Sequence, residues 1–189
     1  MRLNSKGGKI LLGEEKLLIK ELKKGNEKSY GELVELYGNR LIKTCYLILK
    51  DEIEAEDIVQ ETFLIVFSKI HTFKGKSSLY TWIYQIALNL SRDRLRARKD
   101  FILYEDKLQS EERVDDLVID TMDREALRRE LFNLNHIYKE VLILFYFEDL
   151  SIKDICSILE EKEGTIKSRL SRGRVLLKEA IEKGGEFQG

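Results

Sequence analysis

A Gly-Lys-Ser tripeptide at residues 75–77 is the first stretch whose residue types suggest chemistry, because it matches the end of a phosphate-binding P-loop. A P-loop needs an earlier glycine, five residues before the one in this tripeptide, so that successive backbone N–H groups surround the phosphates. The chain has Ile70 at that position, and residues 57–70 have the pattern of a helix rather than of a buried strand. The spacing therefore argues against a nucleotide site, and the loop needs another explanation.

The residue types that bind metals or act as nucleophiles are few and scattered. Cys45 and Cys156 are far apart within apolar patterns, which is typical of buried thiols in a reducing cytoplasm. His71 and His136 have no cysteine or histidine at metal-ligand spacing. The acids of residues 51–57 could bind a metal in a nuclease, but acids at the N-terminus of a helix are the simpler interpretation.

Charge is unevenly distributed along the chain, although the formal net charge is only −1. Residues 1–100 contain 19 Lys and Arg against 14 Asp and Glu, whereas residues 101–130 contain 5 against 10. Two basic clusters flank the acidic middle, RDRLRARK at residues 92–99 and KSRLSRGRVLLK at residues 167–178. This distribution indicates two modules and a linker, and the basic clusters suit either nucleic acid or a solvated helix face.

Hydrophobic periodicity predicts an all-α protein of two small helical domains joined by an acidic linker, because the long segments repeat at helical spacing. Helical stripes that include Leu17, Val34 and Phe67 are expected to face the core. No apolar run is long enough to cross a membrane, and residues 1–16 lack the apolar core of a signal peptide, so we expect a cytoplasmic protein without direct membrane insertion. The expected helices cover residues 14–24, 27–49, 53–70, 78–98, 124–135 and 137–148, and residues 149–183 form a helix, a turn and a helix.

The last helix has two different sides when its residues are placed at 100° intervals. One side is an apolar seam of Ile166, Leu170, Gly173, Leu177 and Ile181, in which the glycine allows a neighbouring helix to approach closely. Away from the seam lie Lys167, Ser168, Ser171, Arg172, Val175 and Lys178. The helix before it begins with a capping box of Ser151 and Asp154, so the pair reads as a helix-turn-helix. Its polar side suits the major groove of DNA, with a solvated amphipathic helix as the alternative.

Three segments together resemble the extracytoplasmic-function (ECF) sigma factors of the sigma-70 family, over about residues 14–182 apart from the linker. AEDIVQETFLIVF at residues 55–67 is similar to the part of the family that docks on the clamp helices of RNA polymerase. FKGKSSLYTWIYQIALNLSRDRLR at residues 73–96 is similar to its promoter-melting segment. Residues 138–177 are similar to its C-terminal promoter-reading helix-turn-helix.

The resemblance assigns roles to individual residues. It implies binding of core polymerase by Asp57, Gln60 and Glu61. It implies that the loop captures a flipped base of the minus-ten element and that the next helix holds the strand, through Lys74, Gly75, Lys76, Ser77, Asn89, Arg92 and Arg96. It implies recognition of the minus-thirty-five element by Thr165, Lys167, Ser168, Ser171, Arg172 and Arg174.

The implied protein is an alternative sigma factor that directs core RNA polymerase to specific promoters and assists their opening. Its implied partners are core RNA polymerase, promoter DNA and an anti-sigma factor, with no cofactor, no small-molecule substrate and no catalysis of its own. The implied parts are an extension (1–13), sigma region 2 (14–98), a linker (99–120), sigma region 4 (121–183) and a tail (184–189). The alternative is a response-regulator-like transcription factor, since GTIKSRLSRGRVLL alone suits one, although residues 1–100 lack the strands and acidic pocket of a receiver module.

Two departures from the family pattern bear on DNA binding. Glu160, Glu161 and Lys162 stand where the turn of the family has glycine, an aliphatic residue and proline, and Asn135 replaces a proline ahead of the second helix of the C-terminal domain. Without glycine the turn is expected to tilt. The two carboxylates are expected to repel DNA phosphates that come within about 8–10 Å at ordinary salt. Weaker recognition of the minus-thirty-five element is the expected result.

Overall fold

The computed structural model describes residues 12–104 and 122–185, and the regular elements in these two ranges are all helices. The all-α prediction is therefore confirmed. In chain order the elements are α1 (Leu12–Lys23), α2 (Glu27–Leu49), α3 (Glu52–Lys69), the 3-10 turn η1 (Ile70–Thr72), α4 (Leu79–Tyr104), α5 (Met122–Asn133), α6 (His136–Leu142), the π-helical η2 (Ile143–Phe147), α7 (Ile152–Leu159) and α8 (Glu163–Gly185).

The helices agree closely with the expected ranges, with two differences. Helix α4 continues to Tyr104 instead of ending near residue 98. The expected helix over residues 137–148 is an α-helix that widens into the π-helical η2. Residues 105–121 hold most of the expected acidic linker, and they lie outside the described residues, as do residues 1–11 and 186–189.

Side-chain caps explain where several helices begin, because an oxygen at the cap position accepts a bond from a backbone N–H that has no partner within the helix. Asn26 caps α2 by accepting from the backbone N–H of Lys28 at 3.0 Å. Asp51 caps α3 in the same way. At Asn135, one of the two departures, the side chain caps α6 by accepting from the backbone N–H of Ile137 at 3.2 Å. Helix α6 therefore starts without the proline that the family uses.

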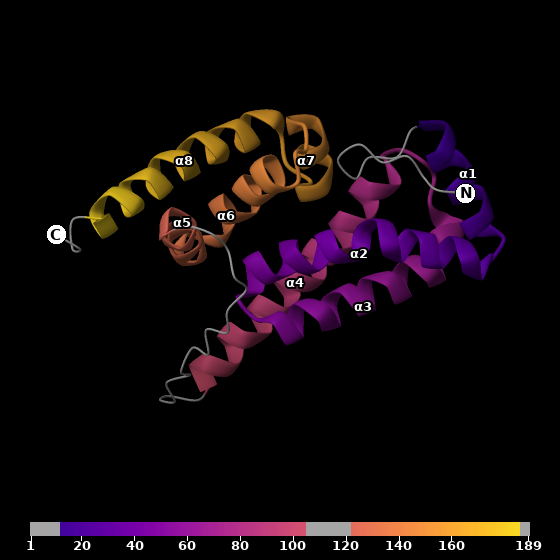
Figure 1. Cartoon of the computed structure of the whole chain (residues 1–189), viewed down its shortest axis with the longest axis horizontal. Helices are drawn as coiled ribbons and strands as arrows, with labels where there is room; N and C mark the ends of the chain where they lie inside the picture. Colours follow the sequence, from indigo (N-terminus) through magenta and orange to yellow (C-terminus); the bar gives the residue numbers. More distant parts are fainter. Residues whose placement is uncertain (1–11, 105–121, 186–189) are drawn as a thin grey trace.

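The N-terminal module, α1 to α4, is built around three long helices that lie side by side, with α1 across one end (Figure 1). Its core is formed by fully buried side chains that recur at helical spacing, among them Leu33, Tyr37, Leu41, Ile58, Val66, Ile83 and Leu88. Burial of such side chains is the main stabilising contribution, at about 1.5–3 kcal/mol for each large one. The module thus holds the loop of residues 73–78 between η1 and α4.

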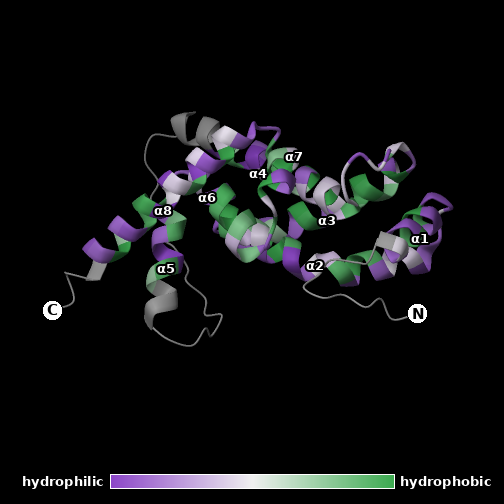
Figure 2. Cartoon of the chain, turned by 90° about the horizontal axis from the view of Figure 1, so that it is seen from above, coloured by the Kyte–Doolittle hydropathy of each residue, from purple (hydrophilic) through white to green (hydrophobic). Residues whose placement is uncertain are grey.

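The C-terminal module, α5 to α8, is smaller and packs α6 against the long helix α8. Figure 2 shows that α8 alternates between hydrophilic and hydrophobic positions. The buried side of α8 includes Ile166 and Leu170 of the predicted seam. An added Cβ at Gly173 would come within 3.2 Å of Leu142 and 3.3 Å of Tyr138. The glycine therefore permits the close approach of α6 and α8, as predicted.

The two modules touch along one continuous surface. Helix α4 packs on α7, and α2 contacts α5, α6 and η2 (Figure 1). None of the helices among the described residues is both long and apolar enough to cross a bilayer.

Candidate functional site

The helix-turn-helix forms as predicted at α7 and α8. Ser151 and Asp154 make the capping box, with the Asp154 backbone N–H bonded to Ser151 Oγ at 3.1 Å. Ile155, Ile158 and Leu159 of α7 are buried, as is Ile166 at the start of α8. Helix α8 is therefore fixed along its apolar seam and presents its other side outward.

The outward side of α8 carries the residues predicted to recognise the minus-thirty-five element. Lys167, Ser168, Ser171, Arg172 and Arg174 are all exposed, and Thr165 is half-buried. Lys167 forms a 2.6 Å ion pair with Glu163 one turn earlier, and this hydrogen bond raises the pKa of the lysine. Cations and hydroxyls on one rigid helix are what base edges and phosphates in a major groove require.

The turn between α7 and α8 contains the first departure from the family pattern. Glu160 adopts the left-handed conformation (φ +56°) that a glycine would adopt, and its backbone N–H caps α7 by donating to the Cys156 carbonyl. The Glu161 carboxylate pairs with Arg169 at 2.6 Å, and Glu160 Oε1 accepts from Gln85 Nε2 at 2.6 Å. Both carboxylates are thus occupied by partners within the chain. The turn stores the strain of a non-glycine residue at positive φ.

The Gly-Lys-Ser loop lies between η1 and α4, where Lys74, Gly75 and Lys76 are exposed and Ser77 is half-buried. Gly75 has a φ of +68°, a conformation that glycine adopts without strain. Its two ends are fixed: Lys23 Nζ donates to the Phe73 carbonyl at 2.7 Å, and Ser78 Oγ accepts from the Thr81 backbone N–H at 3.0 Å. The loop is therefore a short cationic tip on a rigid base.

Helix α4 carries the second basic cluster, and most of its arginines pair with acids of the same chain. Arg92 makes two bonds to Glu140 of the C-terminal module, at 2.9 and 2.6 Å, and this hydrogen bonding raises the pKa of the guanidinium. Arg96 pairs with Asp93, while Asn89 is exposed. Arg92 is thus half-buried at the surface between the modules. The sequence signal, a run of basic residues, did not distinguish it from its neighbours.

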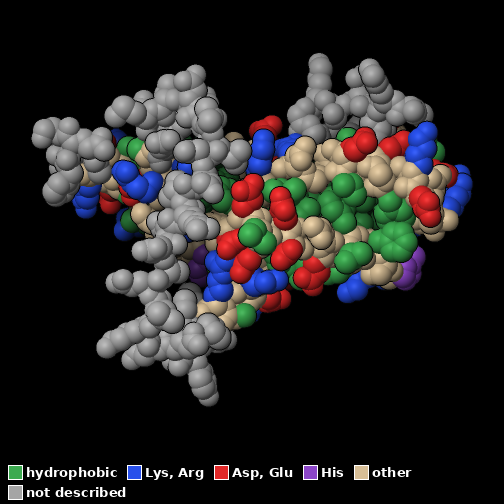
Figure 3. Space-filling view, turned by 60° about the horizontal axis from the view of Figure 1, so that its bottom comes forward, with side chains coloured by type: hydrophobic (Ala, Val, Ile, Leu, Met, Phe, Trp, Pro, Cys, Tyr) green, Lys and Arg blue, Asp and Glu red, His purple; other side chains and the backbone are tan. Residues whose placement is uncertain are grey.

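Helix α3 presents the residues predicted to dock on polymerase. Asp57, Gln60 and Glu61 are exposed and share one face with Ile53 and Leu64, which are 75% and 69% exposed. Figure 3 shows red acidic side chains beside a continuous green hydrophobic area on this side of the molecule.

Three residues predicted to face the core are exposed instead. Val34 and Phe67 are 45% and 57% exposed, and Leu17 of α1 is 47% exposed. The prediction was wrong for these three, because long helices that pack on one side only leave the edges of an apolar stripe in solvent. An apolar area of this kind, rimmed by acids, is typical of an interaction surface.

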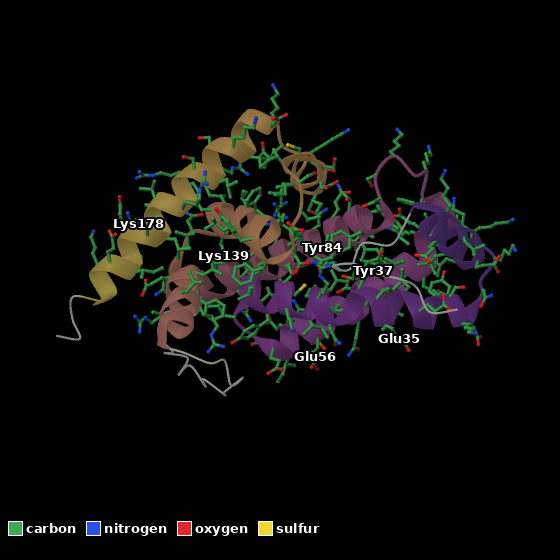
Figure 4. The ribbon with its side chains drawn as sticks, turned by 45° about the horizontal axis from the view of Figure 1, so that its top comes forward. Glu35, Tyr37, Glu56, Tyr84, Lys139 and Lys178 are labelled. Atoms are coloured by element: carbon green, nitrogen blue, oxygen red, sulfur yellow. The ribbon has the colours of Figure 1, made fainter. Side chains whose placement is uncertain are left out.

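Sequence reasoning missed a buried polar cluster centred on Glu148, where the two modules meet. The carboxylate accepts hydrogen bonds from Arg40, Thr44, Tyr80 and Tyr84. Burial first, and then the neighbouring Tyr80 and Glu148, raises the pKa of the Tyr84 hydroxyl, which therefore stays protonated and donates. Figure 4 shows Tyr84 in the interior and Lys178 on the outer α8. The only hint in the sequence is an acid directly after the apolar run ILFYF.

Lys139 lies on the same surface between the modules and is 6% exposed. Its Nζ donates to the Phe132 carbonyl at 3.0 Å and lies over the Phe132 ring, and the Nζ of Lys50, the residue directly after α2, lies over the same ring. Burial and the nearby Lys50 charge lower the pKa of Lys139 to about 8. Cys45 is buried and Cys156 half-buried, both as thiols, and the described residues contain no cluster of metal-binding side chains.

Each of the two modules matches a family model of known proteins. Residues 33–101 match the family model of sigma-70 region 2, and residues 124–177 match that of sigma-70 region 4. The ECF RNA polymerase sigma factor SigW of Bacillus subtilis is 30% identical over 176 residues, which cover 86% of this chain and 94% of SigW. The ECF RNA polymerase sigma-E factor of Haemophilus influenzae is 31% identical over 180 residues, which cover 87% and 94%.

Two solved structures have a similar fold. The sigma factor RpoE of Bartonella quintana, in complex with the anti-sigma factor NepR, matches with a TM-score of 0.73 and 26% identity, over 82% of this chain and 98% of RpoE. CnrH, in complex with the cytosolic domain of CnrY, has the same fold, with a TM-score of 0.68 and 20% identity over 89% of this chain and 97% of CnrH. The match of residues 33–101 to sigma-70 region 2 favours a sigma factor over a response regulator, whose receiver module was expected in this part of the chain.

Proposed function

As the chain belongs to the sigma-70 family and is an alternative RNA polymerase sigma factor of the ECF group, we propose a division of labour between its modules. The N-terminal module docks on core RNA polymerase and opens promoter DNA, and the C-terminal module reads the upstream element. The observation that carries this proposal is the opposite character of two exposed faces. Helix α3 presents acids beside apolar side chains, and α8 presents cations and hydroxyls.

Core polymerase is the proposed partner of the α3 face. Asp57 and Glu61 are i, i+4 neighbours, with Gln60 between them, and neither carboxylate has an ion pair among the described residues. Carboxylates offered in this way suit arginines of a partner helix. Asp57→Ala with Gln60→Ala should weaken binding to core polymerase in a titration, whereas Glu179→Ala on α8, an exposed acid of the other module, should not. Equal affinity for all three proteins would refute this docking site.

Promoter opening is the proposed role of the loop, in which Lys74, Lys76 and Ser77 hold an unpaired base after the duplex has opened. Replacing these three residues by alanine should leave binding to closed promoter DNA by the holoenzyme nearly unchanged and should reduce permanganate reactivity of the promoter thymines. Asn89, Arg92 and Arg96 on α4 are proposed to hold the backbone of the same strand. Unchanged reactivity would contradict the role of the loop.

Upstream recognition is the proposed role of the half-buried Thr165 and of the exposed α8 residues Lys167, Ser168, Ser171, Arg172 and Arg174. Catalysis belongs to the polymerase, so the chain itself needs no cofactor and acts in the cytoplasm. RpoE of Bartonella quintana is held by an anti-sigma factor, and we propose a partner of this class for this chain as well. Run-off transcription with purified core polymerase, with and without the chain, tests the whole proposal: a promoter-specific product that depends on the chain supports it, and its absence on every template refutes it.

A further inference from the structure

The loop of residues 73–78 is held at both of its ends by one helix, α1. Lys23 Nζ, in the last turn of α1, donates to the carbonyl of Phe73, with which the loop begins, at 2.7 Å. Glu15, in the first turn of α1, accepts from the backbone N–H of Leu79, the first residue of α4. Glu15 and Lys23, the two anchors, are eight residues apart in the sequence, which is ~12 Å along a helix axis. Helix α1 therefore spans the base of the loop.

Each anchor bonds to a backbone group at one end of the loop. The first N–H groups of a helix have no acceptor within that helix. At the start of α4, Ser78 Oγ accepts from the Thr81 N–H at 3.0 Å, and Glu15 accepts from the Leu79 N–H. A carboxylate at this place also interacts favourably with the positive end of the helix dipole. The conformation of both ends of the loop thus depends on side chains from outside the loop.

Helix α1 is fixed in the module by contacts other than the anchors. Leu18 and Leu22, which lie between the anchors in the sequence, are 4% and 1% exposed. The helix packs on α2 and η1. The tip of the loop is open by comparison, because Lys74 and Lys76 are exposed and a Cβ added at Gly75 would meet nothing within 4 Å. The position of the tip relative to α4 is therefore set at the two ends of the loop.

We propose that Glu15 and Lys23 are positioning residues for promoter opening, which hold the loop so that its tip meets an unpaired base in a fixed place. A loop that is ordered before it binds loses less conformational freedom on binding, so more of the contact energy is available to stabilise the open promoter. The match to sigma-70 region 2 covers residues 33–101, so α1 lies ahead of it. The positioning role rests on the proposed function of the loop, whereas the anchoring rests on the contacts alone.

The test compares two double variants of the full chain, each assembled with core polymerase on duplex promoter DNA. Glu15→Ala with Lys23→Ala removes the anchors. Glu21→Ala with Lys24→Ala is the matched control, because it removes the same two residue types from an exposed ion pair at the end of α1. The anchor variant should open the promoter about ten-fold more slowly, measured by permanganate reactivity of thymines, because two hydrogen bonds of charged groups are lost. Its binding to closed promoter DNA should match that of the control and the parent.

A second template separates positioning from general damage to the chain. On DNA whose minus-ten region is already unpaired by mismatches, the anchor variant should make as much transcript as the parent, because opening is no longer required. An equal loss on the duplex and on the mismatched template would overturn the positioning role.

Conservative variants test whether the two hydrogen bonds are the cause. Glu15→Gln keeps an acceptor oxygen and Lys23→Arg keeps a donor, so each should restore most of the opening that the corresponding alanine variant loses. If neither restores it, the hydrogen bonds are not what positions the loop. If circular dichroism shows that the double variant is unfolded, Lys23→Ala alone decides, because this side chain is exposed and the core is left intact. It should slow opening by about three-fold.

The loop variant, with Lys74, Lys76 and Ser77 replaced by alanine, distinguishes failure of this inference from failure of the proposed function. Impaired opening in the loop variant together with parental opening in the anchor variant overturns the positioning role and keeps the function. Parental opening in the loop variant refutes the function of the loop. The anchoring is then decided by a spin label at Lys76→Cys, with Cys156→Ser to leave only the buried Cys45. A more mobile label in the anchor variant than in the control supports the anchoring, and equal mobility overturns it.

Discussion

Helices α4 and α8 both carry a basic cluster predicted to contact DNA, but they present it in opposite ways. On α8 the cations Lys167, Arg172 and Arg174 are exposed along one side of a helix that is anchored by its other side. On α4, Arg92 is held by Glu140, and Arg98 pairs with Glu54 at 2.6 Å. The two clusters have similar numbers of basic residues in the sequence. Whether those residues are free to contact DNA depends on acids that are far away in the sequence.

The largest expected effect concerns the α4 cluster. Arg92→Ala leaves Glu140 as a buried carboxylate without its partner, which costs about 3 kcal/mol or more. A loss of this size should lower the thermal midpoint of the full chain by roughly 6–12 °C. Arg96→Ala removes an ion pair with Asp93 in which both side chains are more than half exposed, and should cost at most about 1 kcal/mol. Similar midpoints for the two variants would show that the pairing of Arg92 is not tighter than that of Arg96.

The second prediction concerns the α8 cluster. Arg172→Ala should weaken binding of duplex DNA by about 1–3 kcal/mol and relax sequence choice at one position, if the arginine reads a base edge. Lys167→Ala should weaken binding to all sequences alike and reduce the salt slope by about one unit, as expected for a phosphate contact. Fluorescence anisotropy of the full chain across a salt series measures both. If the two variants changed DNA affinity, sequence choice and salt dependence in the same way, the separate roles of Arg172 and Lys167 would be refuted.

The third prediction concerns what holds α8 in place. Gly173→Val puts a branched side chain where a single Cβ already comes within 3.2 Å of Leu142, so overpacking should cost about 1–2 kcal/mol. Gly164→Val, in the first turn of the same helix, is the matched control because a Cβ there meets nothing within 4 Å. Thermal denaturation should show a lower midpoint only for the first variant. An equal drop of the thermal midpoint in both variants would indicate that the helix propensity of valine, and not overpacking against Leu142, causes the loss.

The smallest expected effect concerns the turn that lies between the two clusters. Glu160→Gly relieves the positive φ, whereas Glu160→Ala keeps the strain, and both lose the bond to Gln85. The glycine variant should therefore be more stable than the alanine variant by about 1 kcal/mol, measured by chemical denaturation. If alanine were the more stable of the two, the backbone strain at Glu160 would be negligible.

The helices and the helix-turn-helix were predictable from the sequence, because their signals are local. The apolar seam of α8 repeats at helical spacing, and Ser151 lies three residues before Asp154. Val34 and Phe67 follow the same periodicity, but nothing local tells the buried middle of a stripe from its exposed edge. The residues proposed to dock on polymerase and to bind DNA were assigned from the resemblance, and the structure shows that most of them are exposed.

The buried polar cluster centred on Glu148 had no such signal. Glu148 and Arg40 are 108 residues apart in the sequence. Tyr80 and Tyr84 have the spacing of any buried helical pair, and Arg92 looks like a surface cation among others. Their meeting depends on how the modules pack, which is a property of the whole chain. The π-helical η2 is likewise invisible in its residues, since ILFYF suits an ordinary buried helix.

The wide turn of η2 has a consequence for how this arrangement can change in evolution. The backbone N–H of Glu148 bonds to the carbonyl of Ile143 at 3.1 Å, five residues back, so the turn contains one residue more than an α-turn. Loss of one codon there would restore ordinary winding and leave Glu148 facing in nearly the same direction, because the wide turn holds its extra residue within about one turn of the helix. The carboxylate would then keep its hydrogen bonds from Arg40, Tyr80 and Tyr84. The wide turn is thus a position at which the chain can gain or lose one residue in evolution while these contacts between the modules are kept.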